Sequence, residues 1–452
     1  MKTNLIVSGG ARATSIASGL LVAWAINIGW GPEYFGIYAA ATSLLAMAGI
    51  CATLGLDSLV LFHQSREGRT PRFDILAAAI RLGILSSVVA CAAILSGIYL
   101  AKSAGASTHT SPIYEVVAYC VPGIVITGIY SAWHQGRKQF IRSMLTPKIT
   151  DALRAVTILI LAIFHAPISW VAASIFATTY VPPILYKIAV KRTSARAYRL
   201  QSADRKFMQH SLLTSFARTG VDHLDIILVS MLTTAEETAT YALASRLASL
   251  ALLGNQMMQP LSLPSFGRQL ALGRIDRAAE QFNSHRSYAV ICSSIIGSAL
   301  LLAGTDLAMV FGRYEKIGSP LVLLCITHVI CCSFGPTGNL LKASGSVRAL
   351  NISGWILVVI RSLMILLFVP EFGVVGAAFS ALFSLFLTNV VNAYQCRKFL
   401  GLQTQHMISN GSTAFALTSS ILYFVGLETT AAALLLAIAV ANLCSNQFKR
   451  CI

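Results

Sequence analysis

The sequence predicts an all-α membrane protein that crosses a lipid bilayer many times. Hydrophobic residues make up 56% of the 452 residues, charged residues make up 11%, and the mean hydropathy is +0.70. Soluble domains carry roughly 25% charged residues, so this chain has too little polar surface to cover its apolar volume in water. Its apolar residues also gather in long runs, which excludes a compact soluble fold.

Fourteen apolar stretches approach or exceed the roughly 20 residues that a spanning helix requires. In chain order they cover residues 5–30, 36–63, 75–101, 113–133, 145–165, 169–190, 209–232, 237–263, 287–311, 320–341, 350–369, 373–394, 409–426 and 429–443. The last two are the shortest. The connections between stretches are short, so we expect no soluble domain on either side of the membrane.

The basic residues predict the orientation of the chain. The formal net charge is +17, from 34 Lys and Arg against 17 Asp and Glu. With a cytoplasmic N-terminus, 25 of the 34, Lys148 among them, fall in cytoplasmic segments, 3 in external segments and 6 within spans. Cytoplasmic loops of membrane proteins carry such an excess. The distribution predicts a multi-pass protein with both termini in the cytoplasm, and it accounts for the charge without a nucleic-acid partner.

Motifs for cofactors, metals and catalysis are missing from the sequence. The ten cysteines form no CxxC pair and lie mostly in apolar runs, so we expect buried thiols rather than a disulfide framework or a zinc site. Walker A, HExxH and GxSxG motifs do not occur. We therefore expect no cofactor, no metal and no enzyme. A membrane-bound glycan polymerase or transferase stays an alternative, although we would expect it to expose a sizeable outer loop.

The chain nearly repeats itself after about 206 residues. Arg12 corresponds in this way to Arg218, and Arg154 to Arg361. The offset spans six helices, an even number, so both halves would enter the membrane from the same side as a parallel repeat. We expect a six-helix bundle in residues 1–206, a second in 207–402 and a helix pair in 403–452. Chance similarity between Ala-, Leu- and Ser-rich helices is the alternative.

Six arginines lie within the predicted spans, where a charged side chain costs about 2.5–3.5 kcal/mol to insert. They are Arg12, Arg81, Arg154, Arg218, Arg246 and Arg361. Arg12 and Arg81 lie near a cytoplasmic helix end, so their side chains could reach the interface instead. Arg218, Arg246 and Arg361 lie close to the predicted bilayer centre. Their excess over acids predicts a cationic cavity, and the guanidinium fork suits phosphates and carboxylates.

Carboxylates within the spans are candidates for coupling transport to an ion gradient. Arg218, Asp222 and Asp225 follow at i, i+4 and i+7, so they share one face of the seventh predicted helix. This face predicts a charged cavity wall, or alternatively an ion pair that only joins helices. Asp57 lies near the inner end of the second span. A mid-membrane carboxylate can take a proton or bind sodium, so Asp57, Asp222 and Asp225 are the candidates.

Four short motifs resemble those of a known family. They are Gly-Pro-Glu-Tyr-Phe-Gly-Ile-Tyr at residues 31–38, Leu-Gly-Leu-Asp at 54–57, Tyr-Ala-Leu-Ala-Ser-Arg-Leu at 241–247 and Pro-Glu-Phe-Gly-Val-Val-Gly-Ala-Ala at 370–378. The chain resembles, up to about Leu402, the Wzx-like polysaccharide flippases of the multidrug/oligosaccharidyl-lipid/polysaccharide exporter superfamily. The resemblance implies a MATE/MurJ-like fold of 12 or 14 helices in two bundles.

The resemblance also implies what the protein transports. The cargo would be an undecaprenyl-diphosphate-linked oligosaccharide, moved across the bacterial inner membrane by alternating access for O-antigen, lipopolysaccharide or exopolysaccharide synthesis. Membrane lipid and a polysaccharide polymerase are the implied partners. The residues that would hold the diphosphate or acidic sugars are Arg12, Arg154, Arg218, Arg246 and Arg361. An ion-coupled multidrug exporter of the same superfamily is the alternative.

The predicted orientation can be tested by labelling. In a variant without native cysteines, a single cysteine at Ser202 should react only with a reagent that reaches the cytoplasm, because it follows a strongly basic segment. A cysteine at Thr234 should react with an impermeant reagent added outside intact cells. The opposite labelling pattern would contradict the orientation.

Overall fold

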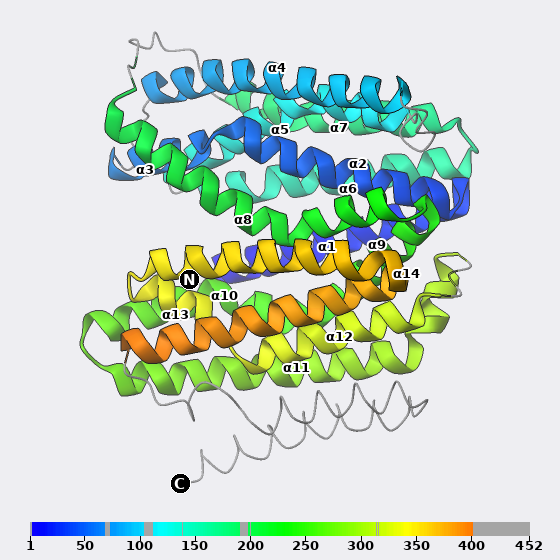
Figure 1. Cartoon of the computed structure of the whole chain (residues 1–452). Coiled ribbons are helices and arrows are strands. Elements are labelled where there is room, and N and C mark those ends of the chain that lie inside the picture. Colours follow the sequence, from blue (N-terminus) through cyan, green and yellow to red (C-terminus); the bar gives the residue numbers. More distant parts are fainter. Residues whose placement is uncertain are drawn as a thin grey trace. The chain divides into compact units, whose positions relative to one another are not determined.

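A computed structural model describes residues 2–67, 73–103, 112–137, 139–189, 198, 200–312, 314 and 316–400. Its described elements are helices, without strands, which confirms the predicted all-α class. The chain divides into two compact units, Met1–Ser230 and Met231–Ile452. Within each unit the long helices run side by side (Figure 1).

The first unit is built around one central helix. Its helices are α1 (Lys2–Trp30), α2 (Pro32–Thr53), α3 (Leu56–Glu67), α4 (Phe73–Ser103), α5 (Pro112–Gly136), α6 (Phe140–Ile163), α7 (Ile168–Ala189) and α8 (Ser202–Leu232). Helix α5 contacts α2, α3, α4, α6 and α7. It buries Val117, Val121, Val125 and Ile129, which recur every four residues and so form one apolar stripe. Helix α1 packs mainly along α6.

The second unit has the same plan. Its helices are α9 (Ala235–Ala248), the 3₁₀ turn η2 (Ser249–Leu252), α10 (Leu253–Ala271), α11 (Ile275–Val310), α12 (Gly318–Ser333), α13 (Thr337–Ala343) and α14 (Val347–Leu400). Helix α12 contacts α9, η2, α11 and α14. The fourth predicted span of each half, α5 and α12, is therefore a central helix of its unit. The divisions at residues 206 and 402 stay predictions.

The first twelve predicted spans all lie on helices of the structure, and the last two lie outside the described residues. By length and composition, seven helices of the described part could cross a membrane. One of the seven covers 51 residues, from Arg348 to Lys398, and includes two predicted spans. The predicted count of fourteen is not confirmed.

The second predicted span, residues 36–63, is two helices rather than one. The chain leaves α2 at Leu54 with φ 53° and continues through Gly55 with φ 76°, both in the left-handed region. A side chain at Gly55 would bring its Cβ to 2.5 Å from the carbonyl oxygen of Met208. Only glycine allows this approach of α8, so the break lets a later helix pack closely. Asp57 follows the break directly.

The break between the eleventh and twelfth predicted spans also falls on a glycine. Helix α14 bends sharply at Gly373, which has φ 55° and ψ −137°. Pro370 just before it lacks the N–H that a helix needs. Phe368 and Phe379 lie on the two sides of the bend, with ring centroids 5.4 Å apart. The bend thus separates the two predicted spans without a loop.

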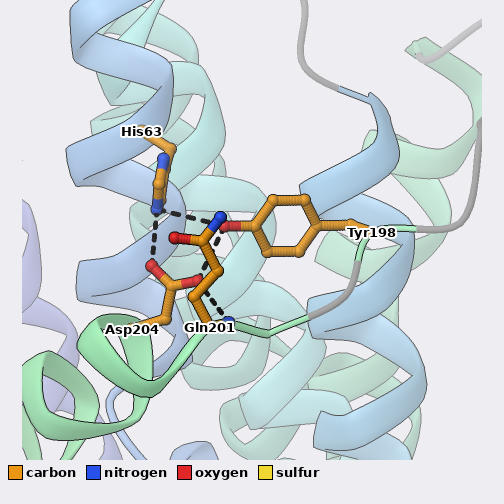
Figure 2. A network of polar contacts seen from close by, with 4 residues as sticks. All are labelled: His63, Tyr198, Gln201 and Asp204. Atoms are coloured by element: carbon orange, nitrogen blue, oxygen red, sulfur yellow. Dashed lines mark hydrogen bonds and ion pairs between the residues drawn. The ribbon is translucent and has the colours of Figure 1, made fainter.

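The start of α8 is held to α3 by a polar network (Figure 2). His63 Nε2 lies 3.0 Å from Asp204 Oδ1, and the Tyr198 hydroxyl donates to Asp204 Oδ2 over 2.8 Å. The backbone N–H of Gln201 donates to the same oxygen over 3.0 Å. Burial by itself would raise the pKa of Asp204, but the bonds from Tyr198, Gln201 and His63 hold that pKa below its usual value.

Asp204→Asn should lower the stability of the protein in detergent by about 1–3 kcal/mol at pH 7, because bonds to a buried carboxylate are lost. A depressed pKa stabilises the fold above the unfolded pKa, and this contribution disappears as pH falls through the folded pKa. Thermal unfolding should therefore separate wild type and variant at pH 7, and less so in acid. Asp276→Asn, an exposed position on α11, is the matched control. Equal melting temperatures at pH 7 would contradict the role of the network.

Candidate substrate-binding site

Helix α6 carries three charged residues near its middle. Lys148, Asp151 and Arg154 stand at spacings of three residues in a helix of 24 residues. At 1.5 Å per residue they lie about 12 to 21 Å along a helix about 36 Å long. All three fall within the predicted span of residues 145–165, where a charged side chain is costly unless a partner compensates it.

The three side chains wind around α6 rather than share one line. Each step of three residues turns by about −60° around the helix axis, since an α-helix has 3.6 residues per turn. Lys148 accordingly reaches α1, and Arg154 reaches α7. Asp151 lies between them in both height and angle. The charges thus form a stripe of plus, minus and plus from one neighbouring helix to the other.

Arg154 is oriented by two hydroxyl groups. Its Nε donates to the Thr178 hydroxyl and its Nη2 to the Thr179 hydroxyl, both over 2.9 Å. The two hydroxyls in turn bond to carbonyls of α7, Ser174 and Ile175. Hydroxyls fix the plane of the guanidinium but do not neutralise its charge. Since a guanidinium has five N–H donors, these bonds leave donors for an anion.

Lys148 has a polar partner on another helix as well as an acid on its own. Its Nζ donates to the Ser15 hydroxyl of α1 over 3.0 Å and lies 3.1 Å from Asp151 Oδ2. The ion pair is partly accessible, with the Lys148 side chain 33% exposed and the Asp151 side chain 37% exposed. The ammonium group is therefore paired without being sealed from the surroundings.

Arg361 takes a corresponding position in the second unit. It lies in the first half of α14 and is 7% exposed. Its charge acts on His328 and Cys331 of α12, which places the guanidinium beside the central helix of its unit. The charge of Arg154 likewise acts on Cys120 of the central helix α5. Each of the two arginines that the repeat pairs therefore lies beside the central helix of its own unit.

The other predicted site residues are spread over several helices. Arg218 is exposed on α8, whereas Asp225 on the same helix is 5% exposed and accepts a bond from the backbone N–H of Ile226. Arg246 on α9 and Asp57 on α3 are half-buried. Arg12 and Asp222 belong to α1 and α8, but their side chains lie outside the described part of the structure. Their predicted roles stay predictions.

Sequence reasoning overlooked Lys148 and Asp151 as site residues. It counts Lys148 with the cytoplasmic charges; in the structure the residue lies eight residues after the start of α6, and its position relative to the membrane stays a prediction. The available signal was the three-residue spacing of Lys148, Asp151 and Arg154 within one apolar stretch. The hydroxyl partners on α1 and α7 could not be identified in this way, because Ser and Thr are common in such helices.

The described residues contain no group of three His, Cys, Asp or Glu side chains that could hold a metal ion. The eight cysteines among them are free thiols. Around Arg154 and Lys148 the polar partners from neighbouring helices are hydroxyl groups. Such a set binds anions by charge-assisted hydrogen bonds.

A protein family is recognised over more than half of the chain. The sequence profile described as "Polysaccharide biosynthesis protein" matches residues 20–270. No curated protein sequence matches the chain.

Solved structures share the fold at low sequence identity. The lipid II flippase MurJ in an inward closed conformation matches with a TM-score of 0.72 at 12% identity, over 98% of this chain and 99% of that chain. An inward-facing multidrug resistance transporter of the MATE family matches with 0.62 at 15% identity, over 89% and 95%. A MOP superfamily transporter from Pyrococcus furiosus, described by the reverse polarity of its binding pocket, matches with 0.58 at 15% identity, over 88% and 94%. The predicted MATE/MurJ-like fold is confirmed.

Proposed function

The chain belongs to the polysaccharide biosynthesis protein family, and from this premise we propose that it flips a lipid-linked oligosaccharide across the bacterial inner membrane. The cargo would carry an undecaprenyl diphosphate, and the carrier would work by alternating access. The observation that carries the proposal is the set of cationic side chains at mid-helix positions, above all Arg154 with its neutral hydroxyl partners. The transporter fold is consistent with this activity.

Electrostatics favours an anionic cargo. A guanidinium inside a spanning helix is costly unless an anion or polar groups compensate it. Hydroxyl partners compensate Arg154 only in part, so a diphosphate that arrives with the cargo would complete its coordination. A cationic drug would instead be repelled by Lys148, Arg154 and Arg361, which argues against a multidrug exporter.

Movement of the cargo requires the binding groups to be reached from each side in turn. We propose that Arg12, Arg154, Arg218, Arg246 and Arg361 contact the diphosphate or acidic sugars at different stages. Asp57, Asp222 and Asp225 are the proposed ion-coupling groups, since a carboxylate within a predicted membrane span can bind a proton or sodium. The positive-inside distribution supports cytoplasmic termini, and a polysaccharide polymerase is the proposed partner on the external side.

Arg154→Ala should reduce export of surface polysaccharide at least tenfold, because a charge-assisted bond contributes about 1.5–3 kcal/mol. Arg154→Lys should rescue export only in part, since an ammonium cannot make the bidentate contact. The same pattern is expected at Arg218 and Arg361. Surface polysaccharide and the amount of folded protein should be measured together in a strain that lacks its own flippase.

Arg81→Ala is the matched control, because Arg81 lies on α4 near the predicted cytoplasmic end of its span and is not among the proposed binding residues, so its removal should leave export unchanged. Normal export by Arg154→Ala and Arg361→Ala, with normal protein amounts, would contradict the site. Export of a cationic dye by the wild type would favour a multidrug exporter instead. Formation of a glycan product by the purified protein would favour an enzyme.

A further inference from the structure

The ion pair of Lys148 and Asp151 joins two residues of one helix. A structural ion pair between helices stabilises their packing, but this pair lies within α6 at i and i+3. The bond that the described structure shows from this pair to another helix is the one from Lys148 to Ser15. Both side chains are about one third exposed, and an accessible ion pair contributes only about 0–1 kcal/mol to stability. Packing alone does not explain the pair.

Asp151 occupies the place where an anion would bind. It lies between two cationic groups, and its carboxylate contacts the ammonium of Lys148 over 3.1 Å. Both members are about one third exposed, so a ligand could reach the ammonium without disruption of a sealed core. The spacing of three residues keeps the carboxylate beside Lys148 whenever no other anion is present.

We infer that Asp151 is a resident counter-ion that occupies Lys148 when no cargo is bound and is displaced by the diphosphate of the cargo. The anion site then extends along α6 from Arg154 to Lys148 and Ser15. This inference rests on the proposed function and adds two residues to its site. The carboxylate lowers the affinity for the cargo anion, and it returns to Lys148 when the anion leaves.

The displacement has a physical consequence for transport. A carrier that binds its cargo too tightly releases it slowly, because affinity differences appear mostly in the dissociation rate. Asp151 competes for Lys148 and so accelerates release. Removal of its charge should therefore strengthen binding and slow turnover, whereas removal of Lys148 should weaken binding.

The experiment measures binding of geranyl diphosphate, a short prenyl diphosphate, to the purified full-length protein by calorimetry. Asp151→Asn should bind about tenfold more tightly than the wild type, and Lys148→Met about tenfold more weakly. The double variant should bind like Lys148→Met, because Asp151 acts through the lysine. Asp151→Ser serves in place of Asp151→Asn if the latter gives little folded protein.

Asp276→Asn removes the same charge at an exposed position of α11 and should leave binding unchanged. Binding by Asp151→Asn that is equal to or weaker than that of the wild type would overturn the inference. Tighter binding that persists in the double variant would also overturn the inference. The carboxylate would then repel the bound anion directly rather than compete for Lys148. The proposed function would stand in both cases.

Failure of the proposed function has a different signature. If the wild type does not bind the prenyl diphosphate at all, both the proposed function and the inference are contradicted. If the wild type binds and Asp151→Asn binds tighter but transports more slowly, the inference is supported. Transport should be followed in proteoliposomes with a fluorescent prenyl-diphosphate sugar.

Discussion

Cationic side chains that are held by neutral hydroxyl partners are the interaction on which the proposed site depends. Arg154 is held by two threonine hydroxyls, which orient the guanidinium and leave its charge in place. The Lys148 ammonium donates to the Ser15 hydroxyl and pairs with the Asp151 carboxylate, which we infer to be displaced by the cargo. Neutral partners of this kind keep a charge tolerable in lipid without cancelling it, so the charge remains available to an anionic ligand.

In each unit an arginine lies beside the central helix. Helix α5 has an apolar stripe that contacts five neighbouring helices, and α12 has four neighbouring elements. Arg154 and Arg361 lie beside these central helices, in packed surroundings that hold a side chain in one orientation. The predicted repeat pairs Arg154 with Arg361, and each of these arginines lies beside the central helix of its own unit.

A glycine break explains why the second predicted span is two helices. Hydropathy is continuous across Leu54 and Gly55, so the sequence predicts one span where the structure has α2 and α3. The cause lies in α8, whose Met208 carbonyl comes too close for any side chain at Gly55. A pattern of apolar residues cannot reveal such an approach, because the approaching residue is about 150 positions away in the sequence.

The sequence by itself determined the all-α class, the helical state of the first twelve predicted spans and the excess of arginine over acids within them. These features are local, because every residue of a spanning helix must match the apolar solvent around it. Only the tertiary structure decided where helices break, which arginines are buried, and that Lys148 and Asp151 form a pair inside α6 beside Ser15 of α1. Those features depend on the neighbouring helix, and helix neighbours follow from packing between distant segments rather than from the composition of any one segment.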